Sequence, residues 1–104
     1  LNRKLNRVED SETVKNNLAL VRNSLVICLI GRNEHLNAKA KYRSALDLAP
    51  DDSTIKVTLV NTGIRLAKEF KKKKWPKNMK EVIRWIQEQD PENIAVKQLL
   101  ENTP

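Results

Sequence analysis

Apolar residues recur along this chain at spacings of three and four, as they do in an α-helix that buries one face. The first such row follows Ser11, a residue type suited to cap a helix, and stops near Gly31. The spacing predicts a helix of about 20 residues, roughly 30 Å long, whose apolar row faces the core. This row consists of Val14, Leu18, Val21, Leu25 and Leu29.

Two more helices follow from the same periodicity. One is predicted over residues 33–48 and ends at the sequence APDD, because the residue before a proline is disfavoured in the helical conformation. The next begins where Asp52 or Ser53 can cap it and runs through Phe70 into a lysine run. The inward residues of the two helices are Leu36, Ala38, Tyr42, Ala45 and Leu46, then Ile55, Leu59, Leu66, Ala67 and Phe70.

The last third of the chain predicts two shorter helices. Pro76 suits the first turn of a helix that ends near Gln89. Asp90 and Pro91 then provide a cap and a first residue for a fifth helix, which contains Val96, Leu99 and Leu100. No segment alternates with period two, so the predicted fold class is all-α.

The chain also repeats itself after 41 residues. On this offset, residues 1–8 correspond to the end of a preceding helix, residues 9–49 and 50–90 form two repeats, and residues 91–104 start a further or capping helix. We expect one helical-repeat module whose ends resemble cuts in a longer solenoid, where each unit covers its neighbour's apolar face. The matching residues are Asp10 and Asp51; Lys15, Lys56 and Lys97; Leu18, Leu59 and Leu100; Leu25 and Leu66; Asn37 and Asn78; Lys39 and Lys80; Arg43 and Arg84; Pro50 and Pro91; Asn61 and Asn102; Thr62 and Thr103.

The segment AKAKYRSALDLAPDD resembles the second helix of a tetratricopeptide repeat. Small Ala38 and Ala45 stand where two helices cross closely, Tyr42 fills the wider gap between them, and Pro50 ends the helix. The second copy, at Met79, Ile83, Ile86 and Pro91, keeps the spacing but not the small residues. The family's first-helix pattern of a large, a small, and a large or aromatic residue is matched by Leu25, Val26 and Leu29, and again by Leu66, Ala67 and Phe70.

This resemblance implies antiparallel helix pairs stacked as a short solenoid of about five helices. The repeat of 41 residues exceeds the family's usual ~34 by about two helical turns, which preserves the facing of the apolar row. The chain is therefore similar to an elongated variant, such as the longer repeats of kinesin light chains. The resemblance covers most of residues 18–100.

In that family the first helices of successive pairs line a groove that holds a peptide. The resemblance implies that the groove here is lined by Asn16, Leu20, Asn23, Ile27, Val57, Asn61, Ile64, Arg65 and Lys68. Asparagine suits contacts with a peptide backbone, because its side chain offers both donor and acceptor. The alternative is that these are ordinary solvated positions. Because Ile27 and Arg65 stand where the family's carboxylate clamp has asparagines, we do not predict a chaperone clamp.

Charge is concentrated in one stretch. The chain has a formal net charge of +7, and the segment from Lys68 to Lys80 holds seven lysines against Glu69, a net +6. By the repeat, residues 72–74 correspond to the turn at residues 31–33. This stretch is interpreted as a solubilising turn, a surface for an acidic partner, a site for nucleic acid or anionic lipid, or a nuclear-import signal. The candidate basic patch consists of Lys71, Lys72, Lys73, Lys74, Trp75, Lys77 and Lys80.

The remaining chemistry indicates no enzyme, no cofactor and no metal site. We expect the single histidine, His35, to be exposed in a turn, and the single cysteine, Cys28, to be a small buried hydrophobe. Asp51, Asp52 and Asp90 are interpreted as helix caps rather than as catalytic acids and bases. With no disulfide within the chain and no secretory-type apolar segment, a cytoplasmic compartment is expected, and the lysine run leaves the nucleus as an alternative.

We therefore predict a scaffold or adaptor module that binds a protein or peptide, an acidic one where the lysines take part, within a larger chain or complex. One alternative is weak binding of nucleic acid or an anionic membrane through residues 71–80. Basic residues do not recur in successive repeats, so such binding is expected to be weak and salt-dependent. The other alternative is a purely architectural repeat segment.

Overall fold

The computed structural model describes the backbone of residues 2–101 and the side chains of residues 11–101. Over this range the chain forms five α-helices and no strand, which confirms the predicted all-α fold. The helices are α1 (Asn2–Gly31), α2 (His35–Leu46), α3 (Ser53–Lys72), α4 (Pro76–Gln89) and α5 (Ile94–Glu101).

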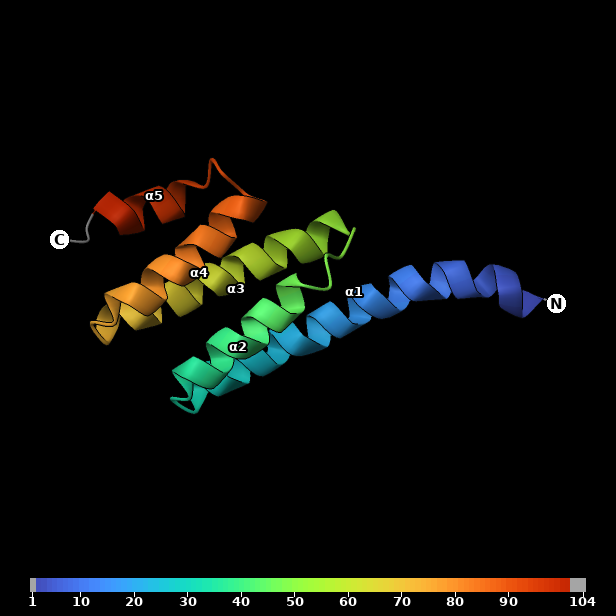
Figure 1. Ribbon diagram of the computed structural model, residues 1–104, viewed down its shortest axis with the longest axis horizontal. Helices are drawn as coiled ribbons and strands as arrows, with labels where there is room; N and C mark the ends of the chain where they lie inside the picture. Colours follow the sequence, from blue (N-terminus) through green and yellow to red (C-terminus); the bar gives the residue numbers. More distant parts are fainter. Residues whose placement is uncertain (1, 102–104) are drawn as a thin grey trace.

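The helices pack in consecutive antiparallel pairs. Figure 1 shows α2 lying along α1 and α4 lying along α3, with α5 at the end of the molecule remote from the start of α1. The pairs stack because α3 contacts both α1 and α2, and α5 in turn contacts α3 and α4. The result is an elongated body of 59 × 30 × 16 Å, with α1 and α3 neighbours in one layer.

The turns that join the two helices of each pair have the same backbone structure. Asn33 and Lys74, 41 positions apart, both adopt left-handed φ angles, of 64° and 62°. The lysine run therefore forms the turn predicted from the repeat, because α3 ends at Lys72 and α4 begins at Pro76. Four backbone hydrogen bonds recur at the same offset: Arg32 N to Cys28 O and Lys73 N to Glu69 O; Asn33 N to Ile30 O and Lys74 N to Lys71 O; Glu34 N to Leu29 O and Trp75 N to Phe70 O; Ala38 N to Glu34 O and Met79 N to Trp75 O.

The core lies where the two pairs meet. Ala38, Tyr42 and Ala45 of α2 are fully buried, as are Leu66 and Phe70 of α3. The Tyr42 hydroxyl crosses to the next repeat and donates a hydrogen bond of 2.8 Å to the carbonyl oxygen of Leu59. Small residues and one aromatic residue in α2 thus let the two pairs pack closely, as predicted.

The first helix is longer than predicted. It runs without a break from Asn2 to Gly31, so Ser11 lies inside α1 and is not its cap. Residues 2–8, which the repeat assigned to the end of a preceding helix, are the first turns of the same helix. The physical reason is local, because residues 2–30 contain neither proline nor glycine to end a helix.

The predicted inward row of α1 is wrong at three of its five residues, while Leu18 is half-buried and Leu29 packs against the core. Val14, Val21 and Leu25 are 59%, 55% and 42% exposed, and a neighbouring row that includes Ala19 and Val26 is fully buried instead. Ala19 in the buried row is small enough to let a neighbouring helix approach α1 closely. The buried face of α1 is set by its contacts with α2 and α3, and its apolar pattern alone does not identify it.

The predicted start of α3 is confirmed, and the starts of α5 and α2 need correction. Asp52 caps α3, its carboxylate accepting hydrogen bonds from the backbone N–H groups of Thr54 at 2.9 Å and Ile55 at 3.1 Å. Asp90 does not cap α5, because residues 91–92 form a turn before that helix begins. Asn93 caps it, and its side-chain oxygen accepts from Val96 N at 3.1 Å. The second helix begins at His35, two residues later than predicted, after the left-handed residue Asn33.

Candidate functional site

Three of the nine residues of the predicted groove line a hollow, and they line two different ones. Asn16 and Leu20 of α1 line a hollow of about 500 Å³ against the start of α3, where Ile55 forms part of the opposite wall. Lys68 lines a smaller one, about 160 Å³, between α3 and α5, beside Leu99. Polar groups from both helices complete the larger hollow: Thr13, Asn17, Asp52, Thr54 and Thr58.

The other groove candidates differ in burial. Asn23 is only 5% exposed and belongs to the row by which α1 packs, so its assignment to the groove surface is wrong. Ile27 is half-buried, and Ile64 packs against the core. The exposed members are Leu20 on α1 and Val57, Asn61, Arg65 and Lys68 on α3.

Two asparagine side chains of α1 keep an unpaired acceptor. The side-chain oxygens of Asn16 and Asn23 are buried and have no hydrogen-bond partner among the described residues. A buried acceptor without a partner is unfavourable by about 1–3 kcal/mol. Asn16 also lines the larger hollow, although its unpaired oxygen is itself buried.

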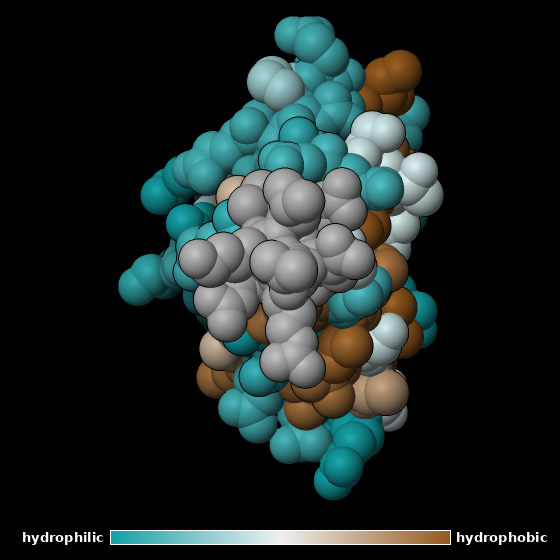
Figure 2. Space-filling model, turned by 90° about the vertical axis from the view of Figure 1, so that its right-hand side faces the viewer, coloured by the Kyte–Doolittle hydropathy of each residue, from teal (hydrophilic) through white to brown (hydrophobic). Residues whose placement is uncertain are grey.

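The layer formed by α1 and α3 exposes several large apolar side chains. Leu20 and Val57 are exposed in addition to Val14, Val21 and Leu25. Figure 2, which looks at the molecule from the end where α1 begins, shows apolar residues mostly at the lower centre and along the right, and hydrophilic residues at the top, left and bottom. An apolar patch that these residues share would mark an interaction site, whereas single exposed apolar residues are ordinary surface.

The second repeat shows what covers the equivalent surface. Ile55 and Leu66 of α3 correspond to Val14 and Leu25 of α1, and they are 7% and 0% exposed. They are buried because α3 packs on the preceding pair, α1 and α2. The outer face of α1 thus carries the same kind of apolar row without a neighbouring pair on it. Cys28 lies on this face and is exposed, so the expectation of a buried thiol is wrong.

The lysine-rich turn holds positive charge that the protein itself hardly neutralises. Of the seven lysines from Lys68 to Lys80, only Lys72 has a carboxylate within 4.0 Å among the described residues, that of Glu69 at 3.5 Å. The Lys73 ammonium lies 5.6 Å from the centre of the Trp75 ring. The equivalent turn of the first repeat differs, because Arg32 pairs with Glu34 at 3.1 Å.

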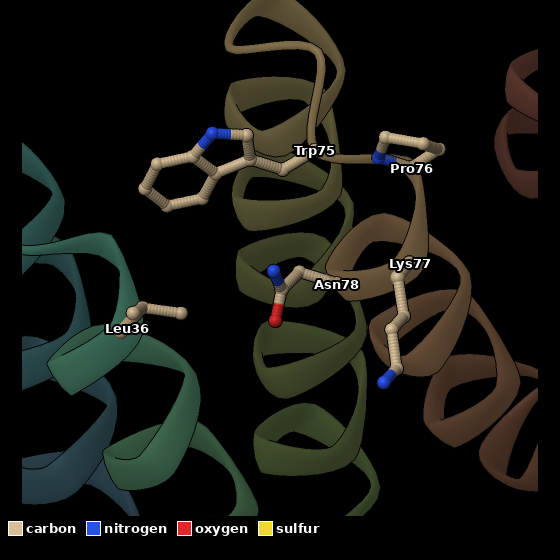
Figure 3. Close-up of a pocket in the computed structure, with 5 residues that line it drawn as sticks. All are labelled: Leu36, Trp75, Pro76, Lys77 and Asn78. Atoms are coloured by element: carbon tan, nitrogen blue, oxygen red, sulfur yellow. The ribbon is translucent and has the colours of Figure 1, made fainter.

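Trp75 forms part of a third hollow. Its ring packs against Phe70, with the ring centres 5.9 Å apart, and remains partly exposed. Figure 3 shows the indole reaching over a gap toward α2, where Leu36 projects toward the same gap. The hollow has a volume of about 290 Å³ and is lined by Leu36, Trp75, Pro76, Lys77 and Asn78.

Sequence reasoning missed Leu36 as a surface residue. It was assigned to the inward side of the second helix, yet it is exposed. One signal was available, because Leu36 corresponds to Lys77 in the next repeat, a residue type that is rarely buried. The apolar position at Leu36 is therefore part of the surface rather than of the core.

His35 is buried, which corrects the expectation of an exposed turn histidine. Its Nε2 lies 3.4 Å from Oε1 of Glu69, and its ring centre is 6.1 Å from that of Phe70. Burial raises the pKa of the Glu69 carboxyl, but the hydrogen bond with His35 and the charge of Lys72 outweigh this and lower it overall. The pair joins the start of α2 to the end of α3, beside the lysine-rich turn.

An ionic contact joins α2 to α4. The Lys39 ammonium lies 3.0 Å from a carboxylate oxygen of Glu81 and donates a hydrogen bond of 2.8 Å to Asn78. The hydrogen bond from Lys39 holds the pKa of Glu81 below its usual value. Trp85, half-buried, has Lys39 and Arg43 over its ring at 5.8 and 5.4 Å. Its ring therefore stabilises the contact between repeats.

Comparison of the chain with protein-family models, with curated proteins and with solved structures finds no match. None of the described helices combines the length and the apolar character that a membrane span needs. Within the described part of the chain, no group of three or more His, Cys, Asp or Glu side chains is placed to hold a metal ion.

Proposed function

We propose that this chain is a helical-repeat interaction module of the tetratricopeptide kind, which binds a protein partner through the α1–α3 face and the lysine-rich turn. The observation that carries the proposal is the hollow with polar walls between α1 and α3, with Leu20 exposed in its lining and Val57 exposed on α3. Apolar side chains supply binding energy on desolvation, and the polar lining orients a peptide backbone.

The hollow between α1 and α3 suits an extended segment. Asn16 contributes an unpaired buried oxygen, and threonines of both helices line the walls. A peptide N–H can donate to a threonine hydroxyl of the walls, and an apolar side chain of the peptide covers Leu20. Both contacts favour a bound peptide over solvent.

Selection from a random peptide display library tests the proposal. We expect the folded chain to enrich one family of peptides, and Leu20→Asp together with Asn16→Ala to weaken their binding at least about tenfold, the effect of losing one anchor contact. Lys56→Glu, a change of one exposed residue outside the larger hollow, is the matched control. Failure to enrich any family, or enriched peptides that bind the double variant as well as the control, contradicts the proposal.

A second candidate function is architectural, with the outer face of α1 covered by another helix pair. It is favoured by the burial of Ile55 and Leu66, the counterparts of the exposed Val14 and Leu25. The rate at which Cys28 is alkylated measures whether this face of α1 is covered, because Cys28 lies on it. We expect rapid labelling in the isolated chain and at least about tenfold slower labelling in a native assembly that covers α1. Equal labelling in both contradicts this function.

A further inference from the structure

We infer that the hollow formed by Leu36, Trp75 and Pro76 is an anchor pocket for one large apolar side chain, carried by an acidic segment of a protein partner. This inference rests on the proposed function, since it specifies the ligand at the lysine-rich turn. The hollow, about 290 Å³, is just below the range of about 300–1,000 Å³ that ligand pockets occupy. It therefore suits a single side chain better than a cofactor.

The apolar walls come from two different repeats. Leu36 belongs to the first turn of α2, whereas Trp75 and Pro76 precede and open α4. Leu36 and Trp75 are both exposed although both are large and apolar. Figure 3 shows their side chains bordering the same gap, with Asn78 between them. A side chain that enters the gap covers apolar surface from both repeats at once, which stabilises the complex by the hydrophobic effect.

The aromatic wall is held in place before any ligand binds. The backbone N–H of Trp75 donates to the carbonyl oxygen of Phe70 at 3.0 Å, and the two rings pack together. Lys73 lies over the indole, which further restrains it. A restrained aromatic residue lowers the entropy lost on binding, which is a property of interface anchors.

The rim determines the charge of the ligand. Lys77 lines the hollow itself, and Lys73 and Lys74 immediately precede Trp75. None of these three ammonium groups has a carboxylate within 4.0 Å among the described residues. The nearby Glu81 is already paired with Lys39 at 3.0 Å. Acidic residues on either side of the anchor therefore complement the rim, and they also speed association.

The apolar walls favour a protein segment over a nucleic acid. Leu36 and Pro76 offer no side-chain hydrogen bond to the edge of a base, whereas they match an aliphatic or aromatic side chain. A nucleic acid contacts the lysines through its phosphates and can stack a base on Trp75, and neither contact requires Leu36. Sensitivity to Leu36 thus separates the two classes of partner.

Fluorescence of Trp75 provides the test. In a Trp85→Phe background, Trp75 is the remaining tryptophan, since the sequence contains two. The probe is a synthetic 12-residue peptide of alternating Asp and Ser with one central Leu. We expect binding at low salt, and about fivefold to tenfold weaker binding when the peptide Leu is replaced by Ser, a change of roughly 1 to 1.4 kcal/mol. Leu36→Ser should weaken the Leu peptide similarly and leave the Ser peptide unchanged.

The lysines are tested on the same background. Lys77→Gln and Lys74→Asn should weaken both peptides and flatten the salt dependence, and asparagine is chosen at position 74 because Asn33 holds the same left-handed conformation. Lys56→Gln is the control, since Lys56 is exposed and does not line this hollow. Unchanged melting temperatures verify that each variant folds.

Three results overturn the inference. They are equal binding of the Leu and Ser peptides, no binding of either peptide at low salt, and stronger binding of single-stranded RNA or phosphatidylserine vesicles that is indifferent to Leu36→Ser. The library selection against the α1–α3 face is independent of these residues. If the library selection succeeds and the Leu-peptide test fails, the proposed function stands and only the anchor pocket is excluded.

Discussion

Tyr42 and Gly63 fit each other across the contact between the two repeats. The Tyr42 ring lies against the α-carbon of Gly63, so close that a β-carbon there would come within 2.7 Å of Cζ of the ring. The same β-carbon would be 2.8 Å from Cγ1 of Ile86 in α4. Gly63 therefore provides the space in α3 through which Tyr42 reaches the carbonyl oxygen of Leu59.

Gly63→Ala is expected to destabilise the protein although alanine is the better helix former. The helix propensity gained is about 1 kcal/mol, while overpacking a rigid core is unfavourable by about 1–3 kcal/mol. The contacts are with a ring and a branched side chain in the core, so we expect a net loss of about 1–2 kcal/mol. Thermal and urea unfolding measure it. Gly31→Ala is the control, since its β-carbon meets nothing within 4 Å, and equal effects of the two changes contradict this packing.

The buried hydroxyl of Tyr42 predicts a loss of stability in alkali. Burial raises the pKa of Tyr42 well above its ordinary value of 10.0. The unfolded chain releases the phenolic proton at about pH 10, while the folded chain holds it, so the free energy of unfolding falls as pH rises above about 10. Urea unfolding at pH 8, 9.5 and 11 measures this slope. Tyr42→Phe has no phenol and should reduce the alkaline slope; an unchanged slope argues against burial of the hydroxyl.

Much of the fold follows from local signals in the sequence. Proline, aspartate and glycine mark the ends of helices at Pro76, Asp52 and Gly31, and the 41-residue repeat places the lysine run in a turn. These signals depend on neighbouring residues only, so they require no knowledge of the packing. The all-α class and the turn were therefore predictable.

The face that α1 buries was not predictable from local signals. The apolar row at Val14, Val21 and Leu25 is the stronger pattern, yet the partner helices cover the row that contains Ala19 and Val26. The choice depends on contacts with α2 and α3, which lie far away in the sequence. The hollow at Leu36, Trp75 and Pro76 could not be predicted for the same reason, because its walls belong to two different repeats.

Burial of His35 likewise arises from a residue distant in the sequence. Its partner Glu69 is 34 positions away, and beside a turn the sequence offered no sign of this contact. Asn93 was overlooked as a cap because Asp90 and Pro91 form the stronger sequence pattern. The turn before α2 brings His35 to Glu69 of α3, and the turn before α5 brings Asn93 to the first backbone N–H groups of α5.

Leu25 and Leu66 give a matched pair that tests the packing of α1. They correspond in the repeat but are 42% and 0% exposed. Leu66→Asp is expected to unfold the module, since it buries an unpaired charge. Leu25→Asp should change the free energy of unfolding by no more than about 0.5 kcal/mol, as an exposed substitution does. Circular dichroism and thermal melting distinguish them, and equal loss in the two variants would show that the face of α1 is covered in the isolated chain.

The pair of Glu69 and His35 predicts a loss of stability in acid. The folded protein holds the pKa of Glu69 below its ordinary value, because the hydrogen bond with His35 and the charge of Lys72 outweigh the opposing effect of burial. A depressed folded pKa stabilises the protein above the unfolded value of about 4.3, and this contribution is lost as pH falls through the folded value. Glu69→Gln should lower stability at pH 7 by about 0.5–1.5 kcal/mol and flatten the dependence below pH 5. Urea unfolding from pH 3 to 7 decides it, with Glu92→Gln at an exposed site as the control.

The lysine-rich turn is expected to be dispensable for the fold and to determine which anions the chain binds. Lys72, Lys73 and Lys74 lie at the end of α3 or beyond it, and the only carboxylate within 4.0 Å of any of them, among the described residues, is Glu69. Changing all three to Glu should lower the melting temperature by only a few degrees, at no more than about 0.5 kcal/mol per exposed site. Binding of acidic peptides should then disappear, because the rim of the hollow reverses its charge.

Parallel titrations of the unmodified chain with labelled RNA and DNA from 20 to 200 mM salt complete the experiment. If the unmodified chain binds nucleic acid with a steep salt slope and leaves acidic peptides unbound, the turn is a phosphate-binding surface and the proposed protein partner at this turn is excluded.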